Sequence, residues 1–373
     1  MRTILIKSKK LLNKTPSGGQ FYSAFSTIEA LFDEAKSEFG DRLIIGVDFA
    51  GGNEEDLKKY FKAPYKVERQ ILYPLWSKTN IGFWEYVHCL TEDIYYKNLF
   101  HSRVLFHVRG IQDWVVQDLP GKRTKVQRHL FVKYLSRMAY RHLVPSSFLK
   151  DQLIKHYRFN PKRVDVIPNG YDPKLFFPEE RCVAYKAIER KYPITKSKLT
   201  VLHVSDLSYK KNIEAVFLVS RELLKSRDIE LLIVGGRNEA AINDARRKAK
   251  GYGLLEKTRF IGPVMQSELR HFYNIADLFL YPSRFDSFGK PALECMACGC
   301  PLLVSTRSGI TDFFNDPRFV VDHNDIENMI KLSLATLDMR RNNDELRADL
   351  SRKAQEFTWD CSADRLIDYY LNL

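Results

Sequence analysis

Residues 275–305 place the tightest limits on what this chain can fold into. Residues 275–281 form a short, nearly continuous apolar run, which is typical of a strand buried on both faces. Proline, serine and glycine in residues 282–289 indicate a loop, and Lys290-Pro291 indicates a helix start, because a first-turn proline needs no N–H partner. Residues 300–305 then predict a second buried strand. A strand–loop–helix–strand unit of this kind indicates an α/β domain.

The same alternation of strand and helix runs through the rest of the chain. Apolar runs predict strands in the first half at residues 3–7, 42–49, 83–90 and 103–108, and in the second half at 199–204, 230–235 and 258–262. Helical patterns lie between them, so we expect parallel sheets. A chain of 373 residues is long enough for two domains, each with its own core.

Two acidic residues follow the strand at residues 275–281. Asp286 lies in the loop and Glu294 on the helix, at a place where doubly wound sheets bind ligands and where a helix start favours phosphate. A carboxylate beside phosphate is unfavourable, so accepting hydrogen bonds from sugar hydroxyls is one role for the pair. The alternatives are that Asp286 caps the helix or forms an Asx-turn, and that Glu294 is an ordinary surface residue.

Cationic, glycine and histidine residues give further candidates. Lys210 and Lys211 lie in the loop after residues 199–204, where they suit a diphosphate, although a lysine pair considered alone is more often part of a solvated surface. Gly18 and Gly19 lie between the first strand and the first helix, where backbone can approach a phosphate closely. A histidine on a strand is commonly a core residue, and that is our interpretation of His88.

The net charge of +13 is unevenly distributed. Residues 1–178 carry 29 Lys and Arg against 18 Asp and Glu, and residues 122–141 contain seven Lys or Arg and no acidic residue. This asymmetry suits an anionic membrane surface or an anionic acceptor, and simple solubility charge is the alternative. The basic segment either lies on an anionic bilayer or packs its apolar stripe on the domain. No nucleic-acid reader motif is recognisable, so we expect no nucleic-acid partner.

Other features limit the class of protein. Six cysteines, three of them at 295, 298 and 300, lack a second pair or a histidine set with zinc-site spacing, so we expect no metal. The first residues have an apolar run too short for a secretion signal, and no window has the roughly 18 apolar residues of a membrane span. We therefore expect a cytoplasmic protein that can also lie peripherally on a membrane.

Residues 282–301, PSRFDSFGKPALECMACGCP, resemble the donor-site signature of family-4-type (GT4) retaining glycosyltransferases. Residues 166–173, VIPNGYDP, also resemble that family. The resemblance implies the GT-B fold, with two Rossmann-like domains facing each other across a cleft. It places an N-terminal acceptor domain at 1–185, a nucleotide-sugar donor domain at 196–355, and a C-terminal helix at 356–373 that crosses back to the first domain.

The resemblance also assigns roles to residues. Glu294 would hold the nucleotide ribose, while Asp286 and the backbone of residues 287–289 would hold the donor sugar. Aspartate at 286 replaces the glutamate common in the family and shortens the reach by one methylene. Lys211 matches the family lysine for the diphosphate. The remaining implied site residues are His107 at the donor sugar, Gly18 and Gly19 at the diphosphate, Lys210 in place of an absent arginine, and Ser287, Phe288, Gly289, Lys290 and Pro291 around the helix start. Apart from the resemblance, the position of Arg109 directly after the strand at residues 103–108 makes it a further candidate for contact with the acceptor or with phosphate.

We therefore predict a hexosyltransferase that uses a UDP- or GDP-linked sugar, without a further cofactor, and a glycan or lipid-linked acceptor. Preorganised cations and helix N–H groups would stabilise the departing diphosphate without a metal. A related GT-B phosphorylase would need a pyridoxal-binding lysine signature, which is not recognisable. The alternative from another class is a catalytically inactive protein that binds a nucleotide sugar or an anionic polymer.

Overall fold

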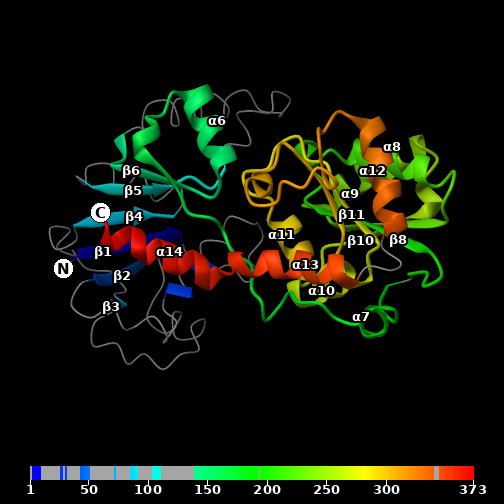
Figure 1. Ribbon diagram of the computed structural model, residues 1–373, viewed down its shortest axis with the longest axis horizontal. Helices are drawn as coiled ribbons and strands as arrows, with labels where there is room; N and C mark the ends of the chain where they lie inside the picture. The colour runs from blue at the N-terminus through cyan, green and yellow to red at the C-terminus, as the bar shows by residue number, and fades with distance from the viewer. Residues whose placement is uncertain are drawn as a thin grey trace. The chain divides into compact units, whose positions relative to one another are not determined.

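The computed structural model describes residues 2–9, 26–27, 30–31, 43–50, 71–72, 85–90, 103–110, 138–192, 194–339 and 344–373. The chain divides into two compact units, which are described separately (Figure 1). The first unit contains Met1–Trp114, Gly121–Gly170 and Trp359–Leu373. The second contains Val115–Pro120 and Tyr171–Thr358.

The first unit is built on a parallel sheet with the strand order β3-β2-β1-β4-β5-β6-β7. Its described strands are β1 (Arg2–Lys9), β2 (Leu43–Ala50), β3 (Ile71–Leu72), β4 (Tyr86–Cys89), β5 (Val104–His107), β6 (Arg141–Val144) and β7 (Val164–Val166). The four strands expected from apolar runs in this half are confirmed as β1, β2, β4 and β5. Helix α6 (Ser147–Tyr157) is capped by Ser146, whose Oγ accepts a hydrogen bond from Leu149 N at 3.0 Å.

The C-terminal helix α14 (Trp359–Leu371) belongs to the first unit. Figure 1 shows this helix (red) alongside β1 (blue), and the two elements share one hydrophobic cluster. Its buried face includes Trp359, Leu366 and Tyr370. Ser362 Oγ fixes the helix by donating to Pro168 O at 2.7 Å. An apolar stripe on an amphipathic helix thus completes a core whose other residues come from between Ile4 and Ile167.

The second unit has a six-stranded parallel sheet with the order β10-β9-β8-β11-β12-β13. Its strands are β8 (Leu199–Ser205), β9 (Ile229–Gly235), β10 (Thr258–Gly262), β11 (Leu278–Tyr281), β12 (Leu302–Ser305) and β13 (Val320–Val321). The helices that cover it are α7 (Arg181–Ile188), α8 (Ile213–Leu223), α9 (Glu239–Gly251), α10 (Gln266–Ile275), α11 (Lys290–Ala297), α12 (Ile326–Met339) and α13 (Asp344–Ala354). The strand–loop–helix–strand unit expected at residues 275–305 is confirmed as β11, α11 and β12.

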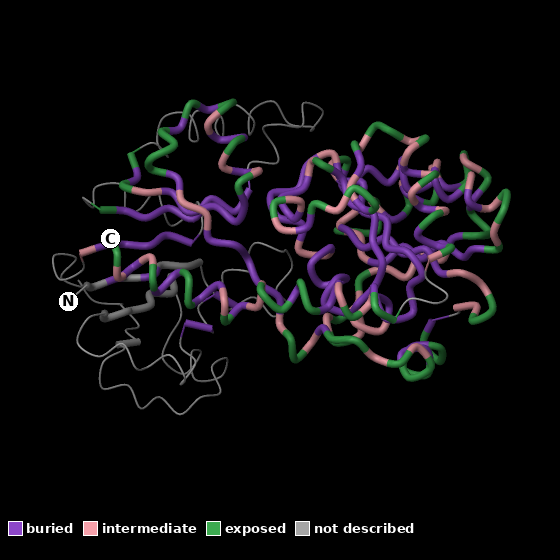
Figure 2. The backbone as a smooth tube through the Cα atoms, viewed as in Figure 1, coloured by how far each residue is buried: buried purple, intermediate pink, exposed green. Residues whose placement is uncertain are grey.

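Side chains that alternate along these strands face two separate clusters, because successive strand residues point to opposite faces. Val201 and Leu278 lie in a cluster with α8, α9 and α12. Leu202 and Phe279 lie in a cluster with α7, α10, α11 and α13. Both faces of the sheet are therefore covered, as the buried (purple) interior in Figure 2 shows. This burial explains why the strands read as continuous apolar runs.

The second unit begins earlier than the 185–196 boundary expected from the sequence. Tyr171, Phe176 and Tyr185 are buried in its hydrophobic cluster. The backbone N–H of Tyr171 also donates to Phe357 O at 3.0 Å. The aromatic residues after the Pro-Asn-Gly turn are thus core residues of the second unit, although they lie within the range 1–185 expected for the first domain. In the described part of the chain, no helix is both long enough and apolar enough to span a bilayer.

Candidate functional site

The candidate site lies at the carboxyl edge of the second sheet, where the strand order changes direction. The chain runs outward from β8 to β9 and β10 and then returns to the other side of β8 with β11. The loops after β8 and β11 therefore leave the sheet as neighbours, and this is the position at which open α/β sheets bind ligands. One loop carries Lys210 and Lys211, and the other carries Asp286.

Arg284 connects these two loops. Its backbone N–H donates to Lys210 O at 2.8 Å, and its guanidinium donates to Tyr209 O at 2.9 Å. The guanidinium carbon also lies 4.2 Å from the centroid of the Tyr209 ring. Asn212 adds a second link, because its Nδ2 donates to Pro282 O at 3.0 Å. The lysine loop is thus fixed relative to the aspartate loop by backbone and side-chain contacts.

Lys211, Tyr281 and Asp286 form a buried cluster, which we call the lysine–tyrosine–aspartate cluster. Lys211 Nζ lies 2.6 Å from Tyr281 OH and forms an ion pair with Asp286 Oδ2. The Tyr281 hydroxyl donates to the same carboxylate oxygen at 2.6 Å. All three residues are buried. A buried ion pair needs such additional hydrogen bonds to offset the loss of hydration.

The cluster keeps both of its charged members ionised. Burial raises the pKa of Asp286, but the charge of Lys211 and the hydrogen bonds from Lys211 and Tyr281 outweigh it, so the pKa lies well below its usual range. Burial likewise lowers the pKa of Lys211, and the Asp286 charge outweighs it, so this pKa lies above its usual value. The site therefore presents a permanent ammonium group at neutral pH.

The second oxygen of Asp286 organises the turn before α11. Asp286 Oδ1 accepts hydrogen bonds from Phe288 N at 3.2 Å and Gly289 N at 3.0 Å. These are the bonds of an Asx-type turn, one of the local roles considered from the sequence. Gly289 has φ +92°, and a Cβ at this position would lie 2.5 Å from Ser308 Oγ. The predicted residues Ser287 and Phe288 are buried beside it.

Glu294 is buried one turn into α11 and is not a surface residue. Its carboxylate lies 3.4 Å from Lys290 Nζ and accepts a hydrogen bond from Tyr273 OH at 3.3 Å. Burial raises the pKa of Glu294, and the neighbouring Lys290 charge opposes this shift only in part. Burial also lowers the pKa of Lys290. Lys290-Pro291 forms the first turn of the helix, as expected.

The loop after β8 has its own hydrogen bonds at Ser205 and Asp206. Asp206 Oδ1 accepts from Ser208 N at 3.1 Å and from Ser208 Oγ at 2.6 Å. Ser205 Oγ accepts from Leu207 N at 3.1 Å and lies 2.8 Å from His203 Nε2. Burial and the adjacent Lys211 charge lower the pKa of Lys210. Lys210 is half-buried in this loop.

In the first unit, His107 ends β5 as expected, and it is buried. Its ring stacks on His88 with centroids 5.5 Å apart and an interplanar angle of 7°. His88 Nδ1 is within hydrogen-bonding distance of Tyr370 OH on α14. Burial, together with the Arg109 charge, lowers the pKa of His88 to about 3 and that of His107 well below its usual value. Both imidazoles are therefore neutral at physiological pH.

Arg109, the further candidate of the sequence analysis, is also buried in the first unit. Its guanidinium donates to Asn169 Oδ1 at 3.1 Å and to Thr27 Oγ1 at 3.4 Å. It thus supports the Pro-Asn-Gly turn that follows β7. The predicted Gly18 and Gly19, and most of the basic segment 122–141, lie outside the described residues.

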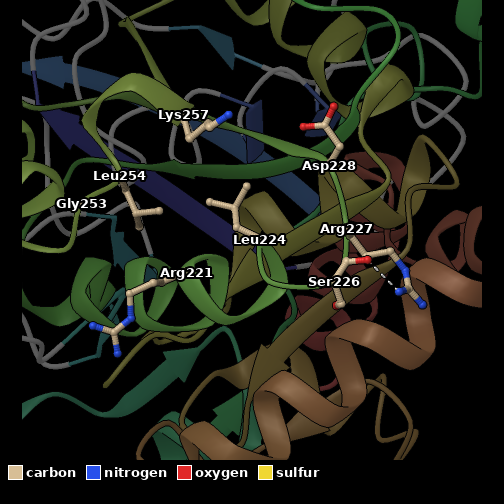
Figure 3. Close-up of a pocket in the computed structure, with 8 residues that line it drawn as sticks. All are labelled: Arg221, Leu224, Ser226, Arg227, Asp228, Gly253, Leu254 and Lys257. Atoms are coloured by element: carbon tan, nitrogen blue, oxygen red, sulfur yellow. Dashed lines mark hydrogen bonds between the residues drawn. The ribbon is translucent and has the colours of Figure 1, made fainter.

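One hollow lies away from the candidate site, at the other edge of the second sheet. It has a volume of about 540 Å³ and is lined by Arg221, Arg227, Lys257 and Asp228, among others (Figure 3). Asp228 directly precedes β9, so this hollow lies at the amino edge of the sheet. A smaller hollow of about 300 Å³ lies beside the lysine loop and is lined in part by Tyr209.

Sequence reasoning missed three residues of the site. Tyr281, at the end of β11, was interpreted only as part of an apolar run, although a tyrosine hydroxyl at the carboxyl end of a buried strand signals a polar partner. Tyr273 reaches Glu294 from α10, 21 positions earlier in the chain. Arg284 offered no local pattern, because its contacts are with a loop 75 positions away.

Comparisons with known proteins agree with this architecture. A family model described as "Glycosyl transferases group 1" matches residues 185–357, and one described as "Glycosyltransferase Family 4" matches residues 86–175. Alpha-monoglucosyldiacylglycerol synthase of Streptococcus pneumoniae is 28% identical over 255 residues, covering 66% of this chain and 56% of the relative. D-inositol 3-phosphate glycosyltransferase of Geodermatophilus obscurus is 28% identical over 229 residues, covering 59% and 49%. The chain spans about half the length of these curated relatives.

Solved structures share the fold over the whole chain. Sucrose-phosphate synthase from Thermosynechococcus elongatus superposes with a TM-score of 0.71 at 19% identity, covering 100% of this chain and 99% of that one. HepE from Anabaena in complex with UDP-glucose superposes with a TM-score of 0.70 at 16% identity, covering 99% of each chain.

Proposed function

The chain belongs to the family-4-type glycosyltransferases and has the GT-B fold of two Rossmann-like units, and we propose that it transfers a hexose-type sugar from a nucleotide diphosphate sugar to an acceptor hydroxyl with retention of configuration. The observation that carries the proposal is the lysine–tyrosine–aspartate cluster at the switch point of the second sheet. It holds a buried ammonium group next to the start of α11, where anionic ligands bind.

The first task of such a site is to stabilise the departing diphosphate. Lys211 supplies a permanent charge, and Lys210 supplies a second cation from the same loop. The start of α11 adds the positive end of the helix dipole. These groups are held in place before the reaction, so they do not need to reorganise as charge develops on the leaving oxygen. Gly18 and Gly19 would contribute backbone from the first unit by resemblance.

The second task is to hold the rest of the donor. Glu294 has a hydrogen-bonding carboxylate at the site edge, and we assign it to the ribose hydroxyls. We assign the donor sugar to the turn at residues 287–289 and to His107. A neutral imidazole can donate to one hydroxyl through one ring nitrogen and accept through the other, so the lowered pKa of His107 suits this role.

Retention follows by resemblance. The bond between the anomeric carbon and the diphosphate oxygen breaks, and the acceptor oxygen forms a bond to the same face of that carbon. The acceptor proton passes to an oxygen of the departing phosphate. In this scheme no side chain has to act as a general base, and the cations beside the phosphate promote the departure of the leaving group.

The acceptor is proposed to be a glycan or a lipid-linked hydroxyl compound. One relative is named as a synthase of a glucosyl diacylglycerol, which makes a lipid acceptor a reasonable choice. The excess positive charge in residues 1–178 would attract an anionic membrane face to a cytoplasmic protein. The donor is proposed to be UDP- or GDP-linked, and a solved structure with this fold holds UDP-glucose.

The test is a screen of UDP, GDP and their sugar conjugates for thermal stabilisation, followed by an assay for sugar release. A ligand at a hundred times its Kd should stabilise the protein by about 2.7 kcal/mol. The matched variant Lys211→Met should lose both the stabilisation and the turnover. The proposal would be contradicted if Lys211→Met kept the turnover of the wild-type protein. It would also be contradicted if no nucleotide sugar stabilised the wild-type protein at millimolar concentration. Unchanged salt-dependent binding of a polyanion by Lys211→Met would instead favour an inactive polymer-binding protein.

A further inference from the structure

We propose that Asp286 is a positioning residue and does not bind the donor sugar: it aims Lys211 at the diphosphate and shapes the turn at residues 286–289. The inference rests on the proposed function, because it concerns how that donor site is built. The proposed role differs from the one that the family resemblance implies for the acidic residue at this position, which is to bind the donor sugar.

The carboxylate of Asp286 is already fully used. An ionised carboxylate offers about four acceptor positions on its two oxygens. Oδ1 accepts from Phe288 N at 3.2 Å and Gly289 N at 3.0 Å. Oδ2 accepts from Tyr281 OH at 2.6 Å and from the Lys211 ammonium. A sugar hydroxyl could bind Asp286 only by displacing one of these donors, which would leave a buried polar group unpaired.

The backbone of Asp286 is held on both sides, which fixes the position from which its side chain reaches its four donors. Its N–H donates to Arg307 O at 2.9 Å, and its carbonyl accepts from Gly309 N at 3.0 Å. The residue therefore forms a bridge with the loop after β12. Its side chain is only 11% exposed. Asp286 thus sits between three loops of the second unit, and four donors hold its carboxylate.

Lys211, by contrast, keeps a donor for the ligand. An ammonium group has three N–H donors. Tyr281 and Asp286 take two of them. The two acceptors fix the direction of the third N–H, because Tyr281 itself is bonded to Asp286. A lysine held at two points is a preorganised contact for one phosphate oxygen, and the flexible side chain need not be ordered when the diphosphate binds.

This arrangement also explains why aspartate stands at position 286. The short side chain reaches the amides two and three residues ahead, which is the geometry of an Asx-type turn. A glutamate carboxylate would lie one methylene further from its own backbone and could not make the same four contacts. Sugar selection would then belong to other groups of the site, such as the 287–289 backbone.

The experiment compares the affinity of one diphosphate with that of its sugar conjugate, using UDP and UDP-glucose, or GDP and GDP-mannose if the guanine pair is the one that binds the wild-type protein. Asp286→Asn keeps the size of the side chain and removes its charge. The positioning role predicts that both affinities fall by the same factor, on the order of tenfold, because the shared diphosphate contact is weakened. The ratio of the two affinities is insensitive to a fraction of misfolded protein.

Two further variants keep the inference falsifiable if Asp286→Asn folds poorly. Tyr281→Phe retains the ion pair between Lys211 and Asp286 and removes the hydroxyl that contacts both residues. It should therefore lower the affinity for both ligands by the same factor, which should be smaller than the factor for Asp286→Asn. Asp286→Glu restores the residue common in the family and should bind both ligands more weakly than wild type does. Loss of the sugar conjugate alone in Asp286→Asn, or tighter sugar binding by Asp286→Glu, would overturn the positioning role while the proposed function stands. A wild-type protein that binds no diphosphate overturns both.

Discussion

Gly289→Ala should lower the free energy of unfolding for two reasons, backbone strain and a steric clash, both located at the start of α11. Gly289 has φ +92°, and an added Cβ would lie 2.5 Å from Ser308 Oγ and 3.2 Å from Ile310 Cβ. A non-glycine residue in a left-handed conformation loses about 1–2 kcal/mol. Overpacking a buried site adds about 1–3 kcal/mol. We therefore expect Gly289→Ala to lower the free energy of unfolding of the second unit by about 2–5 kcal/mol.

Gly253→Ala is the matched control. Gly253 lies in the same unit with φ +71°, and a Cβ there would meet no atom within 4 Å. It should lose only the conformational part, about 1–2 kcal/mol. The gain from a less flexible unfolded chain is common to both substitutions and cancels in the comparison. The difference between the two variants therefore measures the contact with Ser308 and Ile310.

Urea unfolding of both variants, followed by titration with UDP or GDP, provides the measurement. Gly289→Ala should also weaken diphosphate binding, because the displaced turn carries the helix start away from Lys211, whereas Gly253→Ala should bind normally. Adding Ser308→Ala to Gly289→Ala should recover part of the extra loss, since it removes the Oγ that the new methyl group meets. Equal losses in Gly289→Ala and Gly253→Ala, or normal binding by both, would refute this description of the turn.

Three other predictions concern charge. In denaturant titrations, Lys211→Met should lower the free energy of unfolding by about 3–5 kcal/mol, because Asp286 then has no buried counter-charge. The double variant Lys211→Met with Asp286→Asn should recover part of that loss. His88 and His107 are neutral in the folded protein, so below their unfolded pKa of about 6.5 the unfolded state binds more protons and stability falls. Protonation of each histidine in the unfolded state should lower the free energy of unfolding by about 1.3 kcal/mol between pH 7.5 and 5.5. Unfolding curves that do not change over this range would contradict the burial of the two histidines. Glu294→Gln should lower the affinity for UDP on the order of tenfold and leave the affinity for 2′,3′-dideoxy-UDP unchanged in calorimetry, because only UDP has ribose hydroxyls for the carboxylate. Equal losses of affinity for both ligands would show that Glu294 does not bind the ribose.

Much of the second unit could be predicted from the sequence because its strands are buried on both faces. A continuous apolar run located β8 to within one residue at each end. The run at residues 275–281 located the end of β11 at Tyr281 but placed its start three residues too early. The loop between β11 and α11 was readable from Pro282, Gly289 and Lys290-Pro291, which limit the backbone locally. Helix and strand positions follow from such local signals, and the switch point follows from the order of the strands.

The contacts across the site could not be predicted, because they join residues far apart in the chain. Lys211 and Asp286 are 75 positions apart, and only the return of the chain to β11 makes their loops neighbours. His88 and Tyr370 are 282 positions apart and meet because α14 packs on the first sheet. Lys290 and Glu294, in contrast, are one helical turn apart, and this pair could have been read from the sequence.

The first boundary between the units was placed too late for a similar reason. Tyr171 and Phe176 follow a Pro-Asn-Gly turn, and a turn limits the backbone locally without indicating in which unit the next side chains pack. Only the structure shows that these aromatic side chains enter the core of the second unit.

The most direct test of the account is a crystal structure of the protein with the nucleoside diphosphate that the thermal screen selects. The account predicts a phosphate oxygen within hydrogen-bonding distance of Lys211 Nζ, beside the start of α11, with Asp286 still bonded to Tyr281 and Gly289. A diphosphate bound elsewhere, for example among Arg221, Arg227 and Lys257 at the opposite edge of the sheet, would contradict it.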